Sequence, residues 1–558
     1  MDSQWMPPKV PSALPLGKAN IYPLDEPHAV SCSLPTWDSV FGFCRQEEWV
    51  MKHVEWNYPR FYINKPLRDL STAVLHRLQI TDENITCLLF ASPLDAQQCI
   101  ASFSKASPRK ETCHFFIPGS NHWASFSAAI FSSDLIEEAM AFWWNTGSGL
   151  STRHAAFCLQ GFDNVASDSS NPDFQTSAPR QRDPDRPEDA AWMHSAATTM
   201  LDLKSFIAQL ATSEKPGQLP ASPDDVFLFP TGMNAIHTIS KTLSYMETSP
   251  TVVAYGWLYP ETVDVLRSGR WETVLSYKAG NDADLDALEN LLKSGRRVHA
   301  LFCELPSNVT LACPDIHRIR KLADQYGFIV ACDNTVAGFF NIDILPYVDV
   351  VMTSLTKGFS GASNVTGGSL VINPTSPHHP KIHNVLSTTH TNTCFPLDIH
   401  TLLTNSTTLH QRTKTANENT LALLPLLTSH PAIKTVNHPS IHPTAGIYNS
   451  LRKTTTPATT NPETDGHYGN VLSMIFHNPS SAETFYNALD VNKGTSFGTN
   501  FTIAVPYVVL ANFYTRSKVA AYGLPEHVIR VSVGVEDVSG ILGRFVEALR
   551  VVEGDGGR

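Results

Sequence analysis

Residues 350–373 read VVMTSLTKGFSGASNVTGGSLVIN, and this stretch indicates how the rest of the chain is organised. A short apolar run, Val350 to Met352, predicts a buried strand, and Lys357 follows it between hydroxyl residues and a glycine-rich loop. A partly buried amine loses its proton easily, so a lysine in this position can form a Schiff base with an aldehyde. The alternative is a surface lysine in a turn, and the residues upstream favour the first interpretation.

A second strand pattern ends at a carboxylate. Residues 328–332, FIVAC, predict a buried strand that leads into Asp333, and the helical pattern before it ends at Gly327. Ligands of open α/β sheets bind at the carboxyl ends of the strands. An aspartate at that edge can keep a pyridine nitrogen protonated, which makes the ring an electron sink. The alternative for Asp333 is a cap of a helix or turn.

Strand and helix patterns continue to alternate upstream of this pair. Apolar runs end at Glu304 and at Tyr255, and residues 230–233, PTGM, open a helical pattern. Small residues at a helix N-terminus can bind phosphate through free backbone amides and the helix dipole. The repeated alternation predicts an α/β fold, with a mostly parallel sheet and helices on both of its faces.

Taken together, the motifs resemble those of the Cys/Met metabolism family of pyridoxal-phosphate enzymes, in its cystathionine γ-synthase branch. They follow one another in the family order: TGMNAI at 231–236, YG at 255–256, ELPSN at 304–308, DNT at 333–335, SLTK at 354–357 and IRVSVGVED at 529–537. Residues 57–61, NYPRF, and 494–506 resemble the long fungal members in particular. The resemblance implies an aspartate aminotransferase-like fold of type I, with a mostly parallel large-domain sheet and a smaller α+β C-terminal domain.

The resemblance also assigns roles in chemistry. Lys357 would hold the aldehyde of pyridoxal 5'-phosphate and move protons, and Asp333 would pair with the pyridinium nitrogen. Tyr255 would stack on the cofactor ring and assist the leaving group. Arg530 would bind the substrate carboxylate, for which its planar fork is suited, although a surface salt bridge is the alternative for this arginine.

Further residues are assigned to binding. The resemblance implies that Tyr58 and Arg60 lie on an arm that reaches the phosphate of a neighbouring subunit. That arrangement predicts a homo-oligomer, a dimer of dimers. Asn308 would contact the hydroxyl side of the cofactor, and Thr502 lies in the segment assigned to substrate. The remaining phosphate ligands would be Gly232, Met233, Ser354 and Thr356.

The reaction that fits best is γ-replacement on an O-acyl-L-homoserine, with O-acetyl as the expected acyl group. A nucleophile such as L-cysteine, giving cystathionine, or an amine or carbon nucleophile of secondary metabolism would displace the acyloxy group. The alternatives are a homocysteine synthase, a γ- or β-lyase, or an inactive subunit that binds the cofactor. Four positions depart from the family pattern and leave the nucleophile open: Gly358, Ala362, Asn364 and Phe501.

Length and composition set the remaining expectations. The 558 residues predict more than one domain, and a formal net charge of −11 argues against nucleic acid as a partner. We expect three parts: an N-terminal arm and extension at 1–200, with a mobile loop near 162–190, a cofactor-binding domain at 201–375, and a small domain at 376–558. The ten cysteines are dispersed, and no H-E-x-x-H motif occurs. A reduced cytoplasmic chain without a metal site or a membrane partner is therefore expected, and the family resemblance implies that its substrates are small amino acids.

Overall fold

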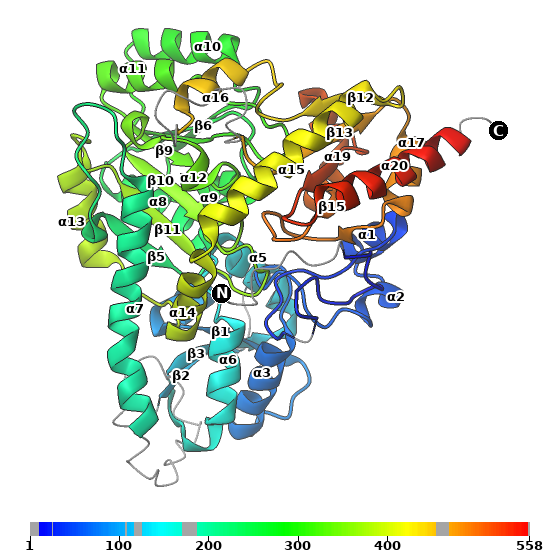
Figure 1. Ribbon diagram of the computed structural model, residues 1–558. Coiled ribbons are helices and arrows are strands. Elements are labelled where there is room, and N and C mark those ends of the chain that lie inside the picture. The colour runs from blue at the N-terminus through cyan, green and yellow to red at the C-terminus, as the bar shows by residue number, and fades with distance from the viewer. Residues whose placement is uncertain are drawn as a thin grey trace.

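The computed structural model contains three sheets, one in each third of the chain (Figure 1). It describes residues 11–24, 26–105, 109–116, 125–169, 187–453 and 468–555. The sheets span 85–169, 226–372 and 433–532, so each falls within one of the three predicted parts. In the predicted loop near 162–190, residues 166–169 instead form a strand, and 170–186 lie outside the described residues.

The central sheet has seven strands and carries the lysine and the aspartate. Neighbouring strands from β10 to β7 run parallel, while β11 is antiparallel to both β10 and β5. The mostly parallel sheet predicted from the sequence is therefore confirmed. In spatial order the strands are β5 Val226–Phe229, β11 Gly368–Ile372, β10 Val350–Ser354, β9 Ile329–Asp333, β8 Ala300–Glu304, β6 Thr251–Tyr255 and β7 Thr273–Tyr277.

Helices cover both faces of this sheet, because their apolar stripes pack on side chains that alternate between its faces. One face holds α8 Gly232–Tyr245, α9 Pro260–Ser268 and α13 His379–Thr389. The other holds α7 Pro187–Ala211, α10 Asp282–Lys293 and α11 Ile316–Tyr326. Gly327 ends α11 in the left-handed conformation (φ +74°), as the sequence predicts. The short α12, Gly338–Asn341, follows β9.

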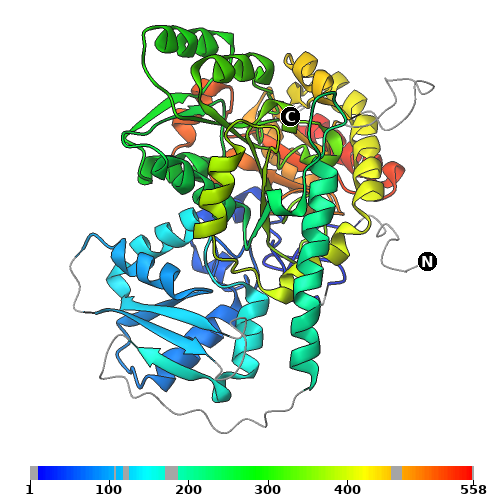
Figure 2. The same ribbon diagram turned by 90° about the vertical axis from the view of Figure 1, so that its left-hand side faces the viewer.

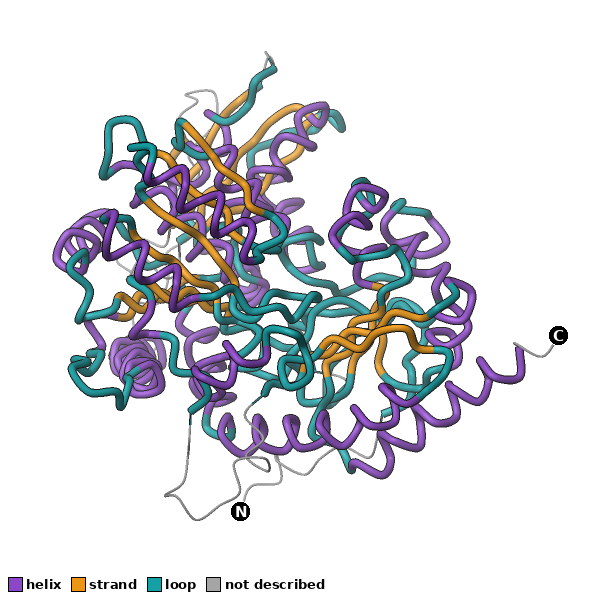
Figure 3. The backbone as a smooth tube through the Cα atoms, turned by 90° about the horizontal axis from the view of Figure 1, so that it is seen from above, coloured by secondary structure: helices purple, strands orange, loops and turns teal. Residues whose placement is uncertain are grey.

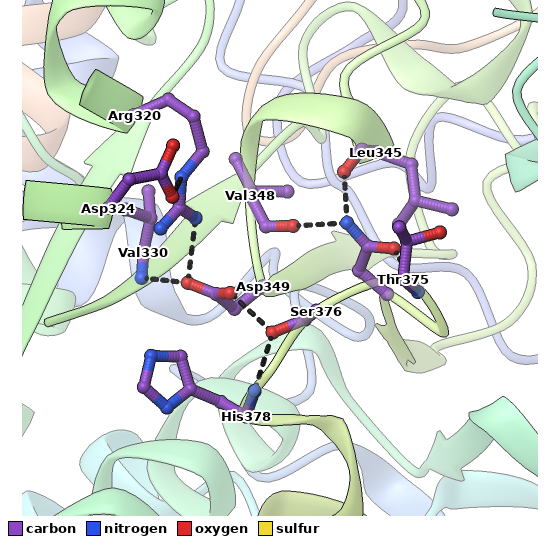
Figure 4. A network of polar contacts seen from close by, with 10 residues as sticks. Arg320, Asp324, Val330, Leu345, Val348, Asp349, Thr375, Ser376 and His378 are labelled. Carbon is purple, nitrogen blue, oxygen red and sulfur yellow. Dashed lines mark hydrogen bonds and ion pairs between the residues drawn. The ribbon is translucent and has the colours of Figure 1, made fainter. Parts of the chain in front are cut away.

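A buried polar network fixes the ends of β9 and β10 that lie opposite the functional edge (Figure 4). Asp349, just before β10, accepts hydrogen bonds from the Val330 amide (2.7 Å) and from Arg320 Nη1 (3.0 Å). Its other oxygen accepts from Ser376 Oγ, beyond β11. Asp349 therefore links β9, β10 and the segment beyond β11. This link stabilises the register of the strands that place Asp333 and Lys357 at the functional edge.

The C-terminal domain is built on a five-stranded, mostly antiparallel sheet. Its strands are β12 Ile433–Asn437, β13 Val471–Phe476, β16 Ile529–Ser532, β15 Ile503–Pro506 and β14 Asn492–Lys493. Residues 396–429 contain two helices, α14 Pro396–Ser406 and α15 Leu409–Ser429. The other helices are α16 Ala445–Leu451, α17 Pro479–Ala488, α18 Tyr507–Ala511, α19 Arg516–Val519 and α20 Val538–Asp555. The Thr/Pro-rich stretch of the sequence at 454–465 lies outside the described residues.

The N-terminal part divides into an arm and a separate domain. The arm carries α1 Trp37–Cys44 and α2 Glu48–Met51 and packs with the core of the C-terminal sheet. The domain that follows has a core of its own and lies below the large sheet, beside the long helix α7 (Figures 1 and 2). Its elements are α3 Lys65–Arg77, β1 Ile85–Phe90, α4 Pro93–Ala101, β2 Lys110–Phe116, β3 Phe126–Ser132, α5 Ile136–Thr146, α6 Thr152–Gln160 and β4 Ala166–Ser169.

Within the part of the chain that the structure describes, no helix is both long enough and apolar enough to cross a bilayer.

Candidate active site

A cavity of about 390 Å³ opens at the carboxyl edge of the central sheet. Loops fill the region between the large and the C-terminal sheets (Figure 3), and the walls of the cavity come from both domains and from the arm. Most of the residues predicted from the sequence meet here: Tyr58, Arg60, Gly232, Met233, Asn308, Asp333, Ser354, Lys357 and Arg530.

Lys357 lies one turn beyond the end of β10 and points toward residues of the arm and of the C-terminal domain. Its Nζ donates a hydrogen bond to Ser496 Oγ (3.0 Å) and lies 4.2 Å from the centre of the Tyr58 ring. Burial lowers the pKa of Lys357 well below its ordinary value, and the charges of Arg530 and Arg60 lower it further. The lowered pKa favours the unprotonated, nucleophilic form of the amine, which Schiff-base formation requires.

Two carboxylates stand side by side at the ends of β8 and β9. Asp333 accepts hydrogen bonds at Oδ1 from the amide (2.8 Å) and hydroxyl (2.5 Å) of Thr335. Its cross-strand neighbour Glu304 accepts from the backbone amides of Tyr259 and Asn308. Burial raises the pKa of both carboxyl groups, and the charge of Asp333 raises that of Glu304 further. A bound cation near Asp333 would stabilise its ionised form, which suits a pyridinium partner.

The N-terminus of α8 forms the part of the cavity suited to a phosphate. Thr231 caps the helix by accepting from the Asn234 amide (3.0 Å). A Cβ at Gly232 would lie 2.7 Å from the Cβ of Ser354, so only glycine allows this approach. Ser354 Oγ is buried and has no hydrogen-bond partner among the described residues. Free helix amides, an unpaired hydroxyl and the nearby Arg60 fit the phosphate of pyridoxal phosphate.

Arg60 and Tyr58 line this cavity from the arm of the same chain. Arg60 is almost fully buried, and it donates to the Trp144 carbonyl oxygen (2.8 Å) and to Tyr259 Oη (2.5 Å). The resemblance instead implies that these two residues serve a neighbouring subunit. In the structure they reach the lysine of their own chain.

Arg530 lies on β16 and enters the cavity from the C-terminal domain. Its Nη2 donates to the Ser496 carbonyl oxygen (2.6 Å) and its Nη1 to Asn308 Oδ1 (3.2 Å). Asn308 also donates to Tyr507 Oη (3.2 Å), so its side chain is held in one orientation. Burial lowers the pKa of Arg530 to about 10, which still leaves the guanidinium charged at neutral pH. Its position suits the binding of a carboxylate.

The structure places three of the predicted site residues outside the lining of this cavity. Tyr255 is fully buried at the end of β6, and its hydroxyl donates to the Asn281 carbonyl oxygen (2.9 Å) outside the cavity. Thr356 Oγ1 pairs with the backbone of Gly367, and Thr502 donates to Glu536 through both its amide and its hydroxyl. None of the three is among the described residues that line the cavity.

The structure also adds residues to which the sequence analysis gave no role. The aromatic ring that does line the cavity after β6 is that of Tyr259. Pro260 at the start of α9 is the signal that marks Tyr259 as a helix cap facing the sheet edge. Other additions are Asn57, Glu261, Glu304, Thr335 and Ser496.

The positions that depart from the family pattern lie elsewhere. Phe501 is buried and packs edge-on against Tyr22 at 5.1 Å, and Asn364 accepts a hydrogen bond from Asn405. Neither these two nor Gly358 and Ala362 belong to the described lining of the cavity. They therefore do not set the shape of the site directly.

Comparison with known proteins settles the class of enzyme. Residues 209–550 match the family model described as Cys/Met metabolism PLP-dependent enzyme. The chain belongs to this family. Its cofactor is accordingly pyridoxal phosphate, as the motifs predict. Residues 66–151 match a further model, described as fungal trans-sulfuration enzyme, N-terminal domain.

The relatives of this family member do not all share one activity. The cystathionine gamma-synthase-like protein ankD of Aspergillus thermomutatus is 41% identical over 97% of this chain and 95% of its own. The cystathionine gamma-synthase of Neurospora crassa is 30% identical over 95% of this chain and 97% of its own. An alanine racemase, ungC, of Aspergillus violaceofuscus is 29% identical over 97% of each chain. The family member is thus a cystathionine γ-synthase-like enzyme, and its substrates need a separate argument.

A solved structure confirms the fold. Cystathionine gamma synthase from Xanthomonas oryzae pv. oryzae superposes with a TM-score of 0.52 at 19% identity, covering 64% of this chain and 98% of that one. The predicted fold of type I is therefore correct. Since nearly all of the bacterial chain is covered, this family member carries additional segments around the shared fold.

Tyr255 at the end of β6 and Tyr259 beyond it give a testable contrast. Tyr259→Phe removes the acceptor of the Arg60 hydrogen bond, and we expect cofactor affinity to fall about 10-fold, since hydrogen bonds to charged groups contribute 1.5–3 kcal/mol. Tyr255→Phe should leave cofactor affinity unchanged and lower the free energy of unfolding by about 1 kcal/mol. Cofactor titration and thermal unfolding of both variants measure the difference. If Tyr255→Phe lost cofactor affinity and Tyr259→Phe did not, the assignment of Tyr259 to the cofactor site would be wrong.

Proposed function

We propose that the enzyme catalyses γ-replacement on an O-acyl-L-homoserine, with the O-acetyl ester as the expected substrate. The observation that carries the proposal is the grouping of Lys357, Asp333 and Arg530 around one cavity. A low-pKa amine, a buried carboxylate and a charged guanidinium are the groups needed to form the cofactor linkage, stabilise a carbanion and hold an amino acid.

Each side chain then has a defined task. Pyridoxal phosphate, when bound, supplies the electron sink that makes loss of the Cα proton feasible. Arg530 binds the α-carboxylate of the substrate and orients Cα toward Lys357. Once the substrate amine has replaced it at the cofactor aldehyde, the free Lys357 amine takes the Cα proton, and a proton then leaves Cβ as the acyloxy group departs from Cγ. Asp333 keeps the ring nitrogen protonated throughout, and addition of a nucleophile at Cγ reverses the proton transfers.

The composition of the cavity favours a nucleophile without a carboxylate. Among the described residues that line it, the cationic side chains are Lys357, Arg60 and Arg530. These are taken by the cofactor aldehyde, its phosphate and the α-carboxylate, so none remains for the carboxylate of cysteine. Part of the lining is apolar and comes from Phe43, Leu510, Ala511 and Phe513. An amine or carbon nucleophile with an apolar body is therefore the second candidate beside cysteine.

The test is release of acetate from O-acetyl-L-homoserine with added cofactor, with and without cysteine, followed by mass analysis of the amino-acid products. Incorporation of cysteine into cystathionine supports a transsulfuration enzyme. Failure to incorporate cysteine, together with a γ-substituted product from an added amine or carbon nucleophile, supports the second candidate. Release accompanied by a 2-oxo acid and ammonia, in place of any γ-substituted product, would show a lyase and overturn γ-replacement. Sulfide replaces cysteine in a parallel assay to detect homocysteine synthesis.

A further inference from the structure

A buried arginine outside the cavity lies against the turn that carries Lys357. Arg412, on α15, is 5% exposed, and burial lowers its pKa to about 10, which leaves the guanidinium charged at neutral pH. Among the described residues, its hydrogen-bond acceptors are all neutral oxygens rather than carboxylates. Burying a cation without a counter-charge is costly, so the groups that accept its hydrogen bonds show what this cation stabilises.

The guanidinium binds two consecutive carbonyl groups directly after the lysine. Arg412 Nη1 donates to the Gly358 carbonyl oxygen (3.2 Å), and Nη2 donates to that of Phe359 (2.9 Å). The Gly361 amide donates to the Lys357 carbonyl oxygen (2.9 Å) and closes a turn at 357–361, the lysine turn. A Cβ at Gly361, which has φ +70°, would overlap Arg412 Nη1, so only glycine lets the guanidinium approach this closely. Arg412 therefore fixes the backbone from which the Lys357 side chain extends.

The same guanidinium also binds the loop at 496–500, between β14 and β15. Arg412 Nη1 donates to Asn500 Oδ1 (3.1 Å), and the Asn500 amide donates to the Gly361 carbonyl oxygen (2.7 Å). A Cβ at Gly498 would overlap the Gly358 amide nitrogen, so this loop packs directly on the backbone of the lysine turn. Arg412 thus links the lysine turn to a loop of the C-terminal domain.

The other end of that loop contacts the reactive groups themselves. Ser496 Oγ accepts the hydrogen bond from Lys357 Nζ (3.0 Å), and the Ser496 carbonyl oxygen accepts from Arg530 Nη2 (2.6 Å). The position of the loop therefore sets where the amine and the carboxylate-binding guanidinium lie relative to each other. Arg412 holds both the lysine turn and this loop, although it is absent from the described lining of the cavity.

We propose that Arg412 is a positioning residue for proton transfer: it holds the lysine turn and the 496–500 loop together so that the Lys357 amine stays where it takes the Cα proton. The inference rests on the role of Lys357 as the base under the proposed function, but not on γ-replacement or on the nucleophile. A displacement of about 1 Å at a reacting group can lower a rate about 10²-fold. A change at Arg412 should therefore slow proton transfer without weakening the binding of substrate or cofactor.

The test is exchange of the Cα proton of L-2-aminobutyrate in heavy water, catalysed by the cofactor-loaded enzyme and followed by NMR. This amino acid carries no leaving group, so its exchange does not require γ-replacement. Arg412→Lys keeps the charge but loses the fork that binds Gly358 and Phe359 together. We expect its exchange rate at saturating aminobutyrate to fall about 10²-fold, with the KM for aminobutyrate and the affinity for the cofactor unchanged.

Arg77→Lys is the matched control, because Arg77 also binds two backbone carbonyl groups, those of Val165 (2.8 Å) and Phe162, but in the N-terminal domain. It should lower the free energy of unfolding and leave the exchange rate at the wild-type value. A second measurement needs no cofactor: amide hydrogen exchange of the peptide that spans 357–361 should be faster in Arg412→Lys than in the wild type or in Arg77→Lys.

A wild-type rate of Cα-proton exchange in folded Arg412→Lys, or equal losses in Arg412→Lys and Arg77→Lys, would overturn the proposal. If exchange slows in Arg412→Lys alone while the wild type forms no γ-substituted product from O-acetyl-L-homoserine, the proposal stands and γ-replacement is wrong. If Arg412→Lys does not fold, Asn500→Ala decides, because it removes only the acceptor on the loop. Slower exchange at unchanged cofactor affinity then supports the proposal, and the wild-type rate refutes it.

Discussion

Replacing Lys357 by alanine is expected to lower acyl-group release by roughly 10²- to 10⁴-fold, the usual contribution of a positioned general base. The absorption band of the lysine-bound cofactor should disappear at the same time. Both effects follow from the position of the amine: it is the cavity's one lysine among the described lining residues, and its lowered pKa supplies the free amine. Stopped-time assays of acetate and an absorption spectrum of the purified variant measure the two losses.

A second buried lysine provides the control. Burial lowers the pKa of Lys493 to about 8, and its Nζ donates to the carbonyl oxygens of Pro35 (2.9 Å) and Asn487. It is absent from the described lining of the cavity. Lys493→Met should therefore lower stability yet keep the cofactor absorption band. Retention of wild-type activity by Lys357→Ala would show that this cavity is not the catalytic site.

The sequence predicts well which reactive side chains lie at the ends of strands, because the end of a strand is a local feature of the chain. Lys357 and Asp333 each follow an apolar run, and parallel strands bring their carboxyl ends to one edge. The placement of both residues in the cavity follows from the alternation of strands and helices alone. Gly232 is likewise visible as a small residue at the start of a helix.

The direction in which a side chain points at a turn is harder to predict from the sequence. Tyr255 ends β6 and Tyr259 lies four residues beyond it, and only the packing of Tyr255 into the hydrophobic core decides between them. Thr502 depends on Glu536, a partner distant along the chain whose contact no local pattern announces. The course of the arm is also non-local, since it depends on contacts with both the N-terminal and the C-terminal domains.

Replacing Arg530 has the second largest expected effect. Arg530→Lys keeps a positive charge but loses the planar fork, and we expect KM for O-acetyl-L-homoserine to rise about 10- to 100-fold, equivalent to 1.5–3 kcal/mol for a charged hydrogen bond. Because the arginine also orients Cα, kcat should fall as well, though by less than in Lys357→Ala. Steady-state kinetics measure KM and kcat, and a cofactor titration measures the affinity for the cofactor separately.

The control must be an arginine outside the cavity whose loss weakens the fold without affecting substrate binding. Arg320 pairs with the buried Asp349 (3.0 Å) at the opposite ends of the strands (Figure 4). Arg320→Ala removes the charged partner of that carboxylate, which keeps its hydrogen bonds from Val330 and Ser376, so stability should fall, yet KM should stay at the wild-type value. If Arg530→Lys lowered stability and cofactor affinity but left KM unchanged, Arg530 would serve to hold Asn308 and the Ser496 backbone, and the substrate carboxylate would bind elsewhere. A rise in KM at unchanged cofactor affinity assigns the carboxylate to Arg530, because a purely structural role would not separate the two constants.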